Sequence, residues 1–261
     1  MLALPAALIY SLLALSQWRP NPLIANKWLI CSALAIAVLL HTLGLKQAIW
    51  VSSGLDLGIF KALSVVALVI AVLLLLSQLR DFQVNLGQWL LPICALAVLA
   101  GIFIESPYEA RSFSFGVTLH ILFALLALAV FSVTMVYALL LRTHDRALKN
   151  HHLSTLTKRL PPLQSMERTQ FKLAWIGFTL LTLAMLMGFI FVDNYFAQHL
   201  LHKTSLTLLS WLFFAVLFIG HHIWGWRALM TLRWYTAAYV LLLLAFFGSK
   251  FVLEVILQRT V

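Results

Sequence analysis

Eight long apolar stretches, separated by short polar segments, constrain the fold of this 261-residue chain more than any other feature. They are residues 2–17, 28–45, 57–79, 87–104, 113–141, 171–192, 204–225 and 233–256. A helix that crosses a bilayer needs about 20 mostly apolar residues. Charged residues make up only 10% of the chain, whereas soluble domains have roughly 25%. We therefore predict an all-α polytopic membrane protein, with about eight transmembrane helices in one bundle that forms a single domain over residues 1–261.

The first stretch has neither a basic region before it nor a small-x-small cleavage site after it. A secretory signal peptide has both features. We therefore expect residues 2–17 to form a helix that is retained in the protein.

The distribution of Lys and Arg predicts how the chain is oriented in the membrane. Twelve of these residues follow the first, third, fifth and seventh stretches, and six lie on the other side. Cytoplasmic loops of membrane proteins carry the excess of positive charge. We expect both termini outside a bacterial inner (cytoplasmic) membrane, and a basic loop inside it over residues 142–170. Pro161 and Pro162 should break a short basic amphipathic helix in that loop.

The net charge of +10 does not indicate nucleic-acid binding, because the basic residues are dispersed among the apolar stretches. The expected surroundings of this chain are the lipid bilayer and other membrane proteins. The sequence contains no Walker motif, G-x-S-x-G or HExxH, and no nucleophile–base pair is visible. We therefore expect a protein that is not an enzyme.

Nine histidines are many for so apolar a chain, and imidazole is a common ligand of haem iron. His41 and His120 fall in the outer half of predicted helices, where an ionisable residue suggests a functional site. The alternative is a neutral histidine that is hydrogen-bonded within the protein. His144 is expected on the surface of the inner loop, as are His151 and His152. His199 and His202 are expected in an outer loop.

Two lysines of the outer half, Lys61 and Lys250, are candidate partners for the propionates of a haem. Glu254 is predicted one turn after Lys250. The alternative is that both lysines extend along the helix so that their ammonium groups reach the interface.

Several segments resemble the cytochrome c assembly membrane proteins of the CcsA/ResC type. They are LHTLGL (40–45), TLHILFALLALAVFSVTMVYALLL (118–141), LPPLQSMERTQFKLAWIGFTLLTLAMLMGFIF (160–191), KTSLTLLSWLFFAVLFIGHHIWGWRALMTLRW (203–234) and FFGSKFVLE (246–254). The resemblance runs from about residue 35 to 256, and its closest form is similar to the short YpjD-like inner membrane proteins.

This resemblance implies non-covalently bound, b-type haem near the outer surface, with no metal beyond the haem iron. His120 takes the place of the family's outer histidine before the tryptophan-rich WWD loop. His221 or His222 takes the place of its intramembrane histidine, and His41 lies in the motif of the second helix.

The chain departs from that family at two places. VDNYFAQHLLHK (192–203) stands where the WWD loop is expected and has no tryptophan, and the segment ILQRTV after the last stretch has no histidine. We therefore expect a haem-binding or haem-handling protein with an accessory role in cytochrome c assembly. Two alternatives remain open: an accessory protein of divalent-cation (Mg/Co) transport or efflux, and a structural scaffold subunit whose histidines only pack.

Overall fold

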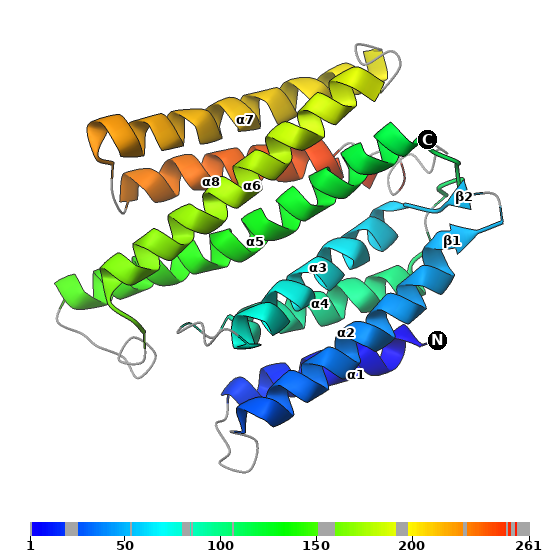
Figure 1. The fold of residues 1–261 in the computed structure, drawn as a ribbon, viewed down its shortest axis with the longest axis horizontal. Helices are drawn as coiled ribbons and strands as arrows, with labels where there is room; N and C mark the ends of the chain where they lie inside the picture. Colours follow the sequence, from blue (N-terminus) through cyan, green and yellow to red (C-terminus); the bar gives the residue numbers. More distant parts are fainter. Residues whose placement is uncertain are drawn as a thin grey trace. The chain divides into compact units, whose positions relative to one another are not determined.

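A computed structural model of the chain describes residues 2–18, 26–52, 54–79, 84, 86–105, 107–150, 160–191, 198–226, 229–248, 250–251 and 254. Eight α-helices lie within these residues, so the prediction of an all-α polytopic membrane protein is confirmed (Figure 1). They are α1 (Ala3–Trp18), α2 (Lys27–Ile49), α3 (Ile59–Leu79), α4 (Gly87–Phe103), α5 (Phe115–Lys149), α6 (Leu163–Phe191), α7 (Gln198–Trp224) and α8 (Leu229–Leu243). A hairpin of two-residue strands, β1 (Trp50–Val51) and β2 (Gly54–Leu55), joins α2 to α3.

Six of the described helices are long and apolar enough to cross a membrane: α2, α3, α5, α6, α7, and α8 together with the π-helical segment Leu244–Gly248 that follows it. The helices α1 and α4 are apolar but have only 16 and 17 residues. At 1.5 Å per residue they are about 25 Å long, slightly less than the bilayer's hydrocarbon core of about 30 Å.

The expected inner loop 142–170 is mostly helical, because α5 continues to Lys149 and α6 begins at Leu163. An ion pair of 2.8 Å between Asp145 and Lys149, one turn apart, supports the polar end of α5. The carbonyl of Pro162 accepts hydrogen bonds from the amides of Ser165 and Met166, which starts α6 directly after the proline pair. The helices α5 and α6 therefore extend beyond their apolar stretches into the expected loop.

This extension corrects the expected environment of three histidines. His144 lies in α5 and is only 6% exposed, although it was expected on a solvated loop. His199 and His202 lie at the start of α7 instead of in a loop. His151 and His152 lie outside the described residues.

The chain divides into two compact units, Met1–Phe113 with Lys250–Val261, and Ser114–Ser249. Each unit holds four of the helices. In the first unit α1 packs against α2 and α4, and α3 packs against α2 and α4. The indole of Trp18 donates to the carbonyl of Gln88 (3.1 Å), and the thiol of Cys94 donates to the carbonyl of Ala67 (3.5 Å). These bonds join α1 to α4 and α4 to α3.

In the second unit α5 and α6 run side by side, and α8 contacts both α5 and α7 (Figure 1). The centre of this unit is aromatic: the rings of Phe131 and Phe214 stack 4.1 Å apart and are fully buried. The hydroxyl of Tyr235 donates to the carbonyl of Phe131 (2.9 Å), and that of Ser210 donates to the carbonyl of Ala238 (2.7 Å). These two buried hydroxyl groups thus find partners on neighbouring helices, which lowers the cost of their burial.

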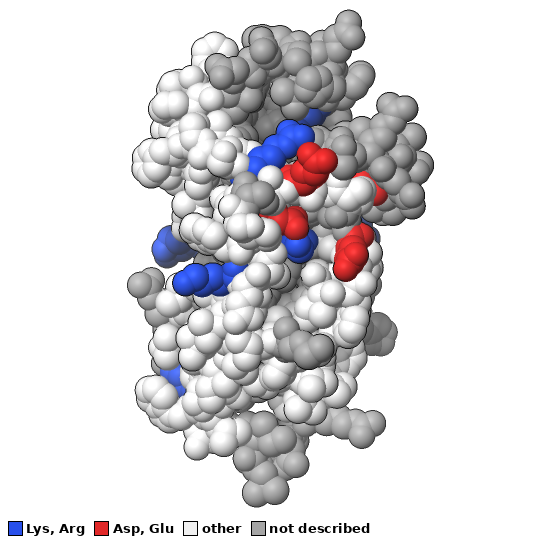
Figure 2. All heavy atoms as spheres, turned by 90° about the vertical axis from the view of Figure 1, so that its right-hand side faces the viewer, with Lys and Arg blue, Asp and Glu red and all other residues white. Residues whose placement is uncertain are grey.

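The outward faces of the helices carry large apolar side chains, among them Leu8, Leu12, Leu96 and Phe189. Most of the described surface in Figure 2 is likewise formed by residues other than Lys, Arg, Asp and Glu. Such a surface is stable against lipid and would be unstable in water.

Candidate functional site

His120 lies in the outer half of a predicted helix, and its surroundings leave one ring nitrogen available; those of His221 do so as well. His120 lies in the second turn of α5, and its Nδ1 is 2.6 Å from the carbonyl oxygen of Ala184 on α6. A carbonyl oxygen can only accept, so Nδ1 carries the proton and donates it. The neutral ring then has its lone pair on Nε2. Within the described part of the chain Nε2 has no hydrogen-bond partner.

Small residues on α6 bring the two helices close enough for this bond. Ala184 and Gly188 are both buried on the face of α6 toward α5. A carbonyl oxygen has two lone pairs, so that of Ala184 can accept a bond from outside the helix. A metal-binding histidine usually donates its other N–H to a carbonyl or carboxylate, which fixes its tautomer and its orientation. His120 has this arrangement.

His41 differs from His120 because both of its ring nitrogens are engaged. The fully buried ring lies 3.3 Å from the hydroxyl of Tyr10 through Nδ1 and 2.9 Å from the hydroxyl of Ser64 through Nε2. Tyr10 is on α1, and Ser64 is on α3. The geometry matches the alternative of a hydrogen-bonded histidine that joins three helices of the first unit. Ligation by His41 would require one of these bonds to break.

His221 and His222 lie in the last turn of α7, which ends at Trp224. The Nδ1 of His221 donates to the carbonyl of Trp226 (2.8 Å), and its ring stacks on Phe171 of α6 at 3.6 Å. Gly225, with φ +63°, lets the chain reverse after α7 so that the amide of Trp226 reaches the carbonyl of Gly220. His222 is exposed.

His120 and His221 cannot share one iron. His120 contacts α6 at Ala184, and His221 contacts it at Phe171. These two positions are 13 residues apart along one helix, which corresponds to about 20 Å at 1.5 Å per residue. Two axial ligands of a single haem lie only a few ångström apart across the iron. His41 belongs to the other unit.

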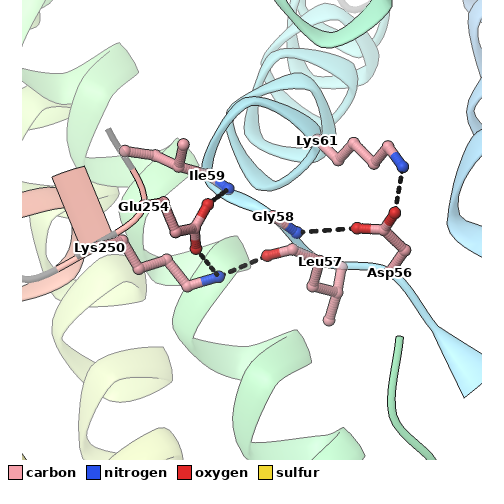
Figure 3. A network of polar contacts seen from close by, with 7 residues as sticks. All are labelled: Asp56, Leu57, Gly58, Ile59, Lys61, Lys250 and Glu254. Atoms are coloured by element: carbon pink, nitrogen blue, oxygen red, sulfur yellow. Dashed lines mark hydrogen bonds and ion pairs between the residues drawn. The ribbon is translucent and has the colours of Figure 1, made fainter. Parts of the chain in front are cut away.

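The two lysines expected to face propionates are each bound within the first unit (Figure 3). Lys61 forms an ion pair with Asp56. Lys250 donates to the carbonyl of Leu57 and lies 3.7 Å from the carboxylate of Glu254. The other oxygen of Glu254 accepts the amide of Ile59 at 2.8 Å, at the start of α3. The contacts thus hold the segment before α3 against the segment that contains Lys250 and Glu254.

Tyr108 adds an aromatic face to this network, because the Lys250 ammonium lies 4.8 Å from its ring centroid. Burial raises the pKa of Tyr108, and the nearby carboxylates of Glu254 and Asp56 act in the same direction, although Arg111 opposes them. The phenol is therefore neutral at pH 7, and its ring stabilises the ammonium by a cation–π contact.

Sequence reasoning selected His120 but did not identify the groups that distinguish it from His41. Ala184 is one alanine among many in the sequence, and a backbone carbonyl leaves no residue signal. The available sign was the pair Ala184 and Gly188, since small residues four positions apart mark close helix contacts in membranes. Among the described residues, no group of three or more His, Cys, Asp and Glu side chains is placed to hold a metal ion.

Comparisons with known proteins match most of the chain. The family model described as "Cytochrome C assembly protein" covers residues 26–257. The inner membrane protein YpjD of Escherichia coli (strain K12) is 32% identical over 231 residues, which are 85% of this chain and 85% of that protein. An uncharacterised 28.8 kDa protein of Azospirillum brasilense is 29% identical (83% and 77%), and protein HemX of Brevibacillus brevis is 26% identical (82% and 84%). No solved structure matches the chain.

Proposed function

Because this chain belongs to the cytochrome c assembly protein family and is a multi-pass inner membrane protein, we propose that it binds haem non-covalently as an accessory component of cytochrome c assembly. The axial ligand in this proposal is Nε2 of His120. Haem held by an imidazole supplies a redox-active iron whose potential depends on its axial ligands.

The observation that carries this proposal is the bond between Nδ1 of His120 and the carbonyl of Ala184. It selects the tautomer that leaves Nε2 unprotonated, orients the ring and increases the basicity of Nε2. The ring is half-buried, and this bond ties it to α6. These features preorganise one nitrogen donor.

Four of the expected haem contacts receive less support. His41 already bonds at both nitrogens, and Lys61 and Lys250 already bind protein groups. The proposal therefore assigns the axial ligand to His120 alone and leaves these residues to hold the first unit together. His221 lies too far along α6 to be the second ligand of the same iron.

A visible absorption spectrum of the full chain, purified in mild detergent from haem-replete cells, tests the proposal. We expect a Soret band in the wild type that is lost or shifted in His120→Ala. His222→Ala is the matched control, because it removes an exposed imidazole and should leave the band unchanged. Haem-free wild-type protein that also fails to bind added haem would overturn the proposal.

A further inference from the structure

An open pocket in the second unit lies between the start of α6 and the end of α7. Its volume is about 650 Å³, and its lining includes Arg168, Lys172, Phe171, Trp175 and His221. Positive and aromatic side chains therefore share one concave surface. Glu167 is the acidic residue at its rim.

The two cations of this pocket are not neutralised by the protein. Arg168 and Lys172 are one helical turn apart and both are exposed. In the part of the chain that the structure describes, neither forms an ion pair, and Glu167 pairs with neither of them. The guanidinium of Arg168 and the ammonium of Lys172 are thus both available to an anion. The carboxylate of Glu167 lowers the net charge of the pocket lining from +2 to +1.

The aromatic side chains of the pocket stack on neighbouring rings. Trp175 stacks on Phe218 of α7 at 4.2 Å, and Phe171 stacks on His221. Trp226, whose carbonyl accepts from His221, stacks on Trp224 and on Trp234 at centroid distances of 5.6 and 5.5 Å. Half of the indole of Trp175 and half of the neighbouring Ile176 remain exposed. A ligand of this pocket therefore meets apolar surface directly beside the cations.

The length of α6 places the pocket at the membrane interface. Its 29 residues span about 43 Å, which exceeds the hydrocarbon core of about 30 Å by about nine residues. The other end of α6 carries the exposed apolar side chains Phe189, Ile190 and Phe191, which belong in the core. The excess therefore lies at the start of the helix, so that Arg168 and Lys172 are at headgroup level. Trp175 is then at the edge of the core, where tryptophan is favoured.

We propose that this pocket binds the phosphate headgroup of an anionic phospholipid of the inner leaflet. Arg168 and Lys172 contact the phosphate, and Trp175 and Ile176 contact the first methylenes of the acyl chains. Basic pockets between membrane helices bind anionic headgroups by this combination of charges and apolar surface. The inference does not rest on haem binding.

Native mass spectrometry of the full chain with added lipid tests this site. Phosphatidylglycerol and phosphatidylcholine with identical acyl chains are compared on the wild type and on Arg168→Gln/Lys172→Gln. We expect the wild type to prefer phosphatidylglycerol by about tenfold or more, and this preference to fall to within about twofold in the double variant. Trp175→Ala should weaken the binding of both lipids.

Arg146→Gln/Lys149→Gln is the matched control, since it removes two exposed cations from the end of α5 outside the pocket lining. The proposal predicts that this control keeps the preference, and a loss equal to that of the pocket variant would overturn it. A preference that persists in the pocket variant would overturn it as well. Displacement of the lipid by an equal concentration of inorganic phosphate would show a site for small anions and contradict a lipid site. Loss of bound haem in the pocket variant, with lipid binding unchanged, would assign the pocket to haem instead.

Discussion

At the scale of single residues, the environment of each histidine decides what it can do. His120 and His41 resemble each other in sequence, since both lie in apolar helices near the same predicted membrane face. In the structure His120 donates one proton to a backbone carbonyl and leaves a lone pair, whereas His41 is enclosed by two hydroxyl groups. The sequence predicted both candidates, but it could not separate them, because their partners come from other helices.

The bonds of His41 lead to a prediction about stability. In His41→Ala the buried hydroxyls of Tyr10 and Ser64 lose a partner, and an unsatisfied buried group costs about 1–3 kcal/mol. We expect a lower thermal unfolding midpoint in detergent, with an unchanged Soret band in the protein that stays folded. His222→Ala should unfold like the wild type. A Soret band lost in His41→Ala and kept in His120→Ala would transfer the ligand role to His41.

At the scale of helices, the sequence predicted all eight and located their apolar parts well. It placed the polar ends less well, because Leu163–Gln170 and Arg142–Lys149 are not apolar, although they are helical. The features that set these ends are local: the ion pair of Asp145 with Lys149 and the start of α6 at Pro162. Close contacts between helices likewise depend on single small residues.

Gly177 is such a residue in the contact between α5 and α6. A Cβ at this position would lie 2.7 Å from the ring of Phe131, which is fully buried and stacked on Phe214. We expect Gly177→Ala to destabilise the protein by about 1–3 kcal/mol, the usual cost of overpacking. Gly248→Ala is the control, because its added methyl would meet its neighbours at 3.9 Å. Equal unfolding midpoints for the two variants, measured by intrinsic fluorescence, would contradict this packing.

Glu254 gives a prediction for the start of α3. Its carboxylate accepts the amide of Ile59 and is only 2% exposed. In Glu254→Ala that amide loses its acceptor, so we expect its hydrogen exchange to be faster than in the wild type. Glu254→Gln retains a side-chain oxygen that can accept this amide. We therefore expect the exchange of the Ile59 amide to be slower in this variant than in Glu254→Ala. Protection of Ile59 that is unaffected by the alanine variant would show that this bond does not form in the membrane protein.

At the scale of the whole molecule, composition alone was sufficient to predict a membrane protein, because 63% hydrophobic residues cannot be buried in a soluble chain of this size. The orientation rests on the distribution of Lys and Arg and is still a prediction, as is the single domain. The division into two compact units had no counterpart in the sequence, since the apolar stretches look alike on both sides of residue 113.

Cysteine accessibility tests the predicted orientation. Glu109 and Asn150 are both exposed and are expected on opposite sides of the membrane. In intact spheroplasts a membrane-impermeant maleimide should label Glu109→Cys, and Asn150→Cys only after permeabilisation. The natural Cys31 and Cys94 are buried and should contribute little background. The reverse labelling pattern would show that the chain has the opposite orientation in the membrane.

The most direct test of the central claim is the spectrum of His120→Gly with and without added imidazole. Removal of the ring leaves a space beside the carbonyl of Ala184, which free imidazole can enter to restore a nitrogen ligand. We predict that the Soret band is lost in the variant and returns with imidazole. The Soret band of His222→Gly should match that of the wild type both with and without added imidazole. A His120→Gly band identical to that of the wild type without imidazole would contradict the account.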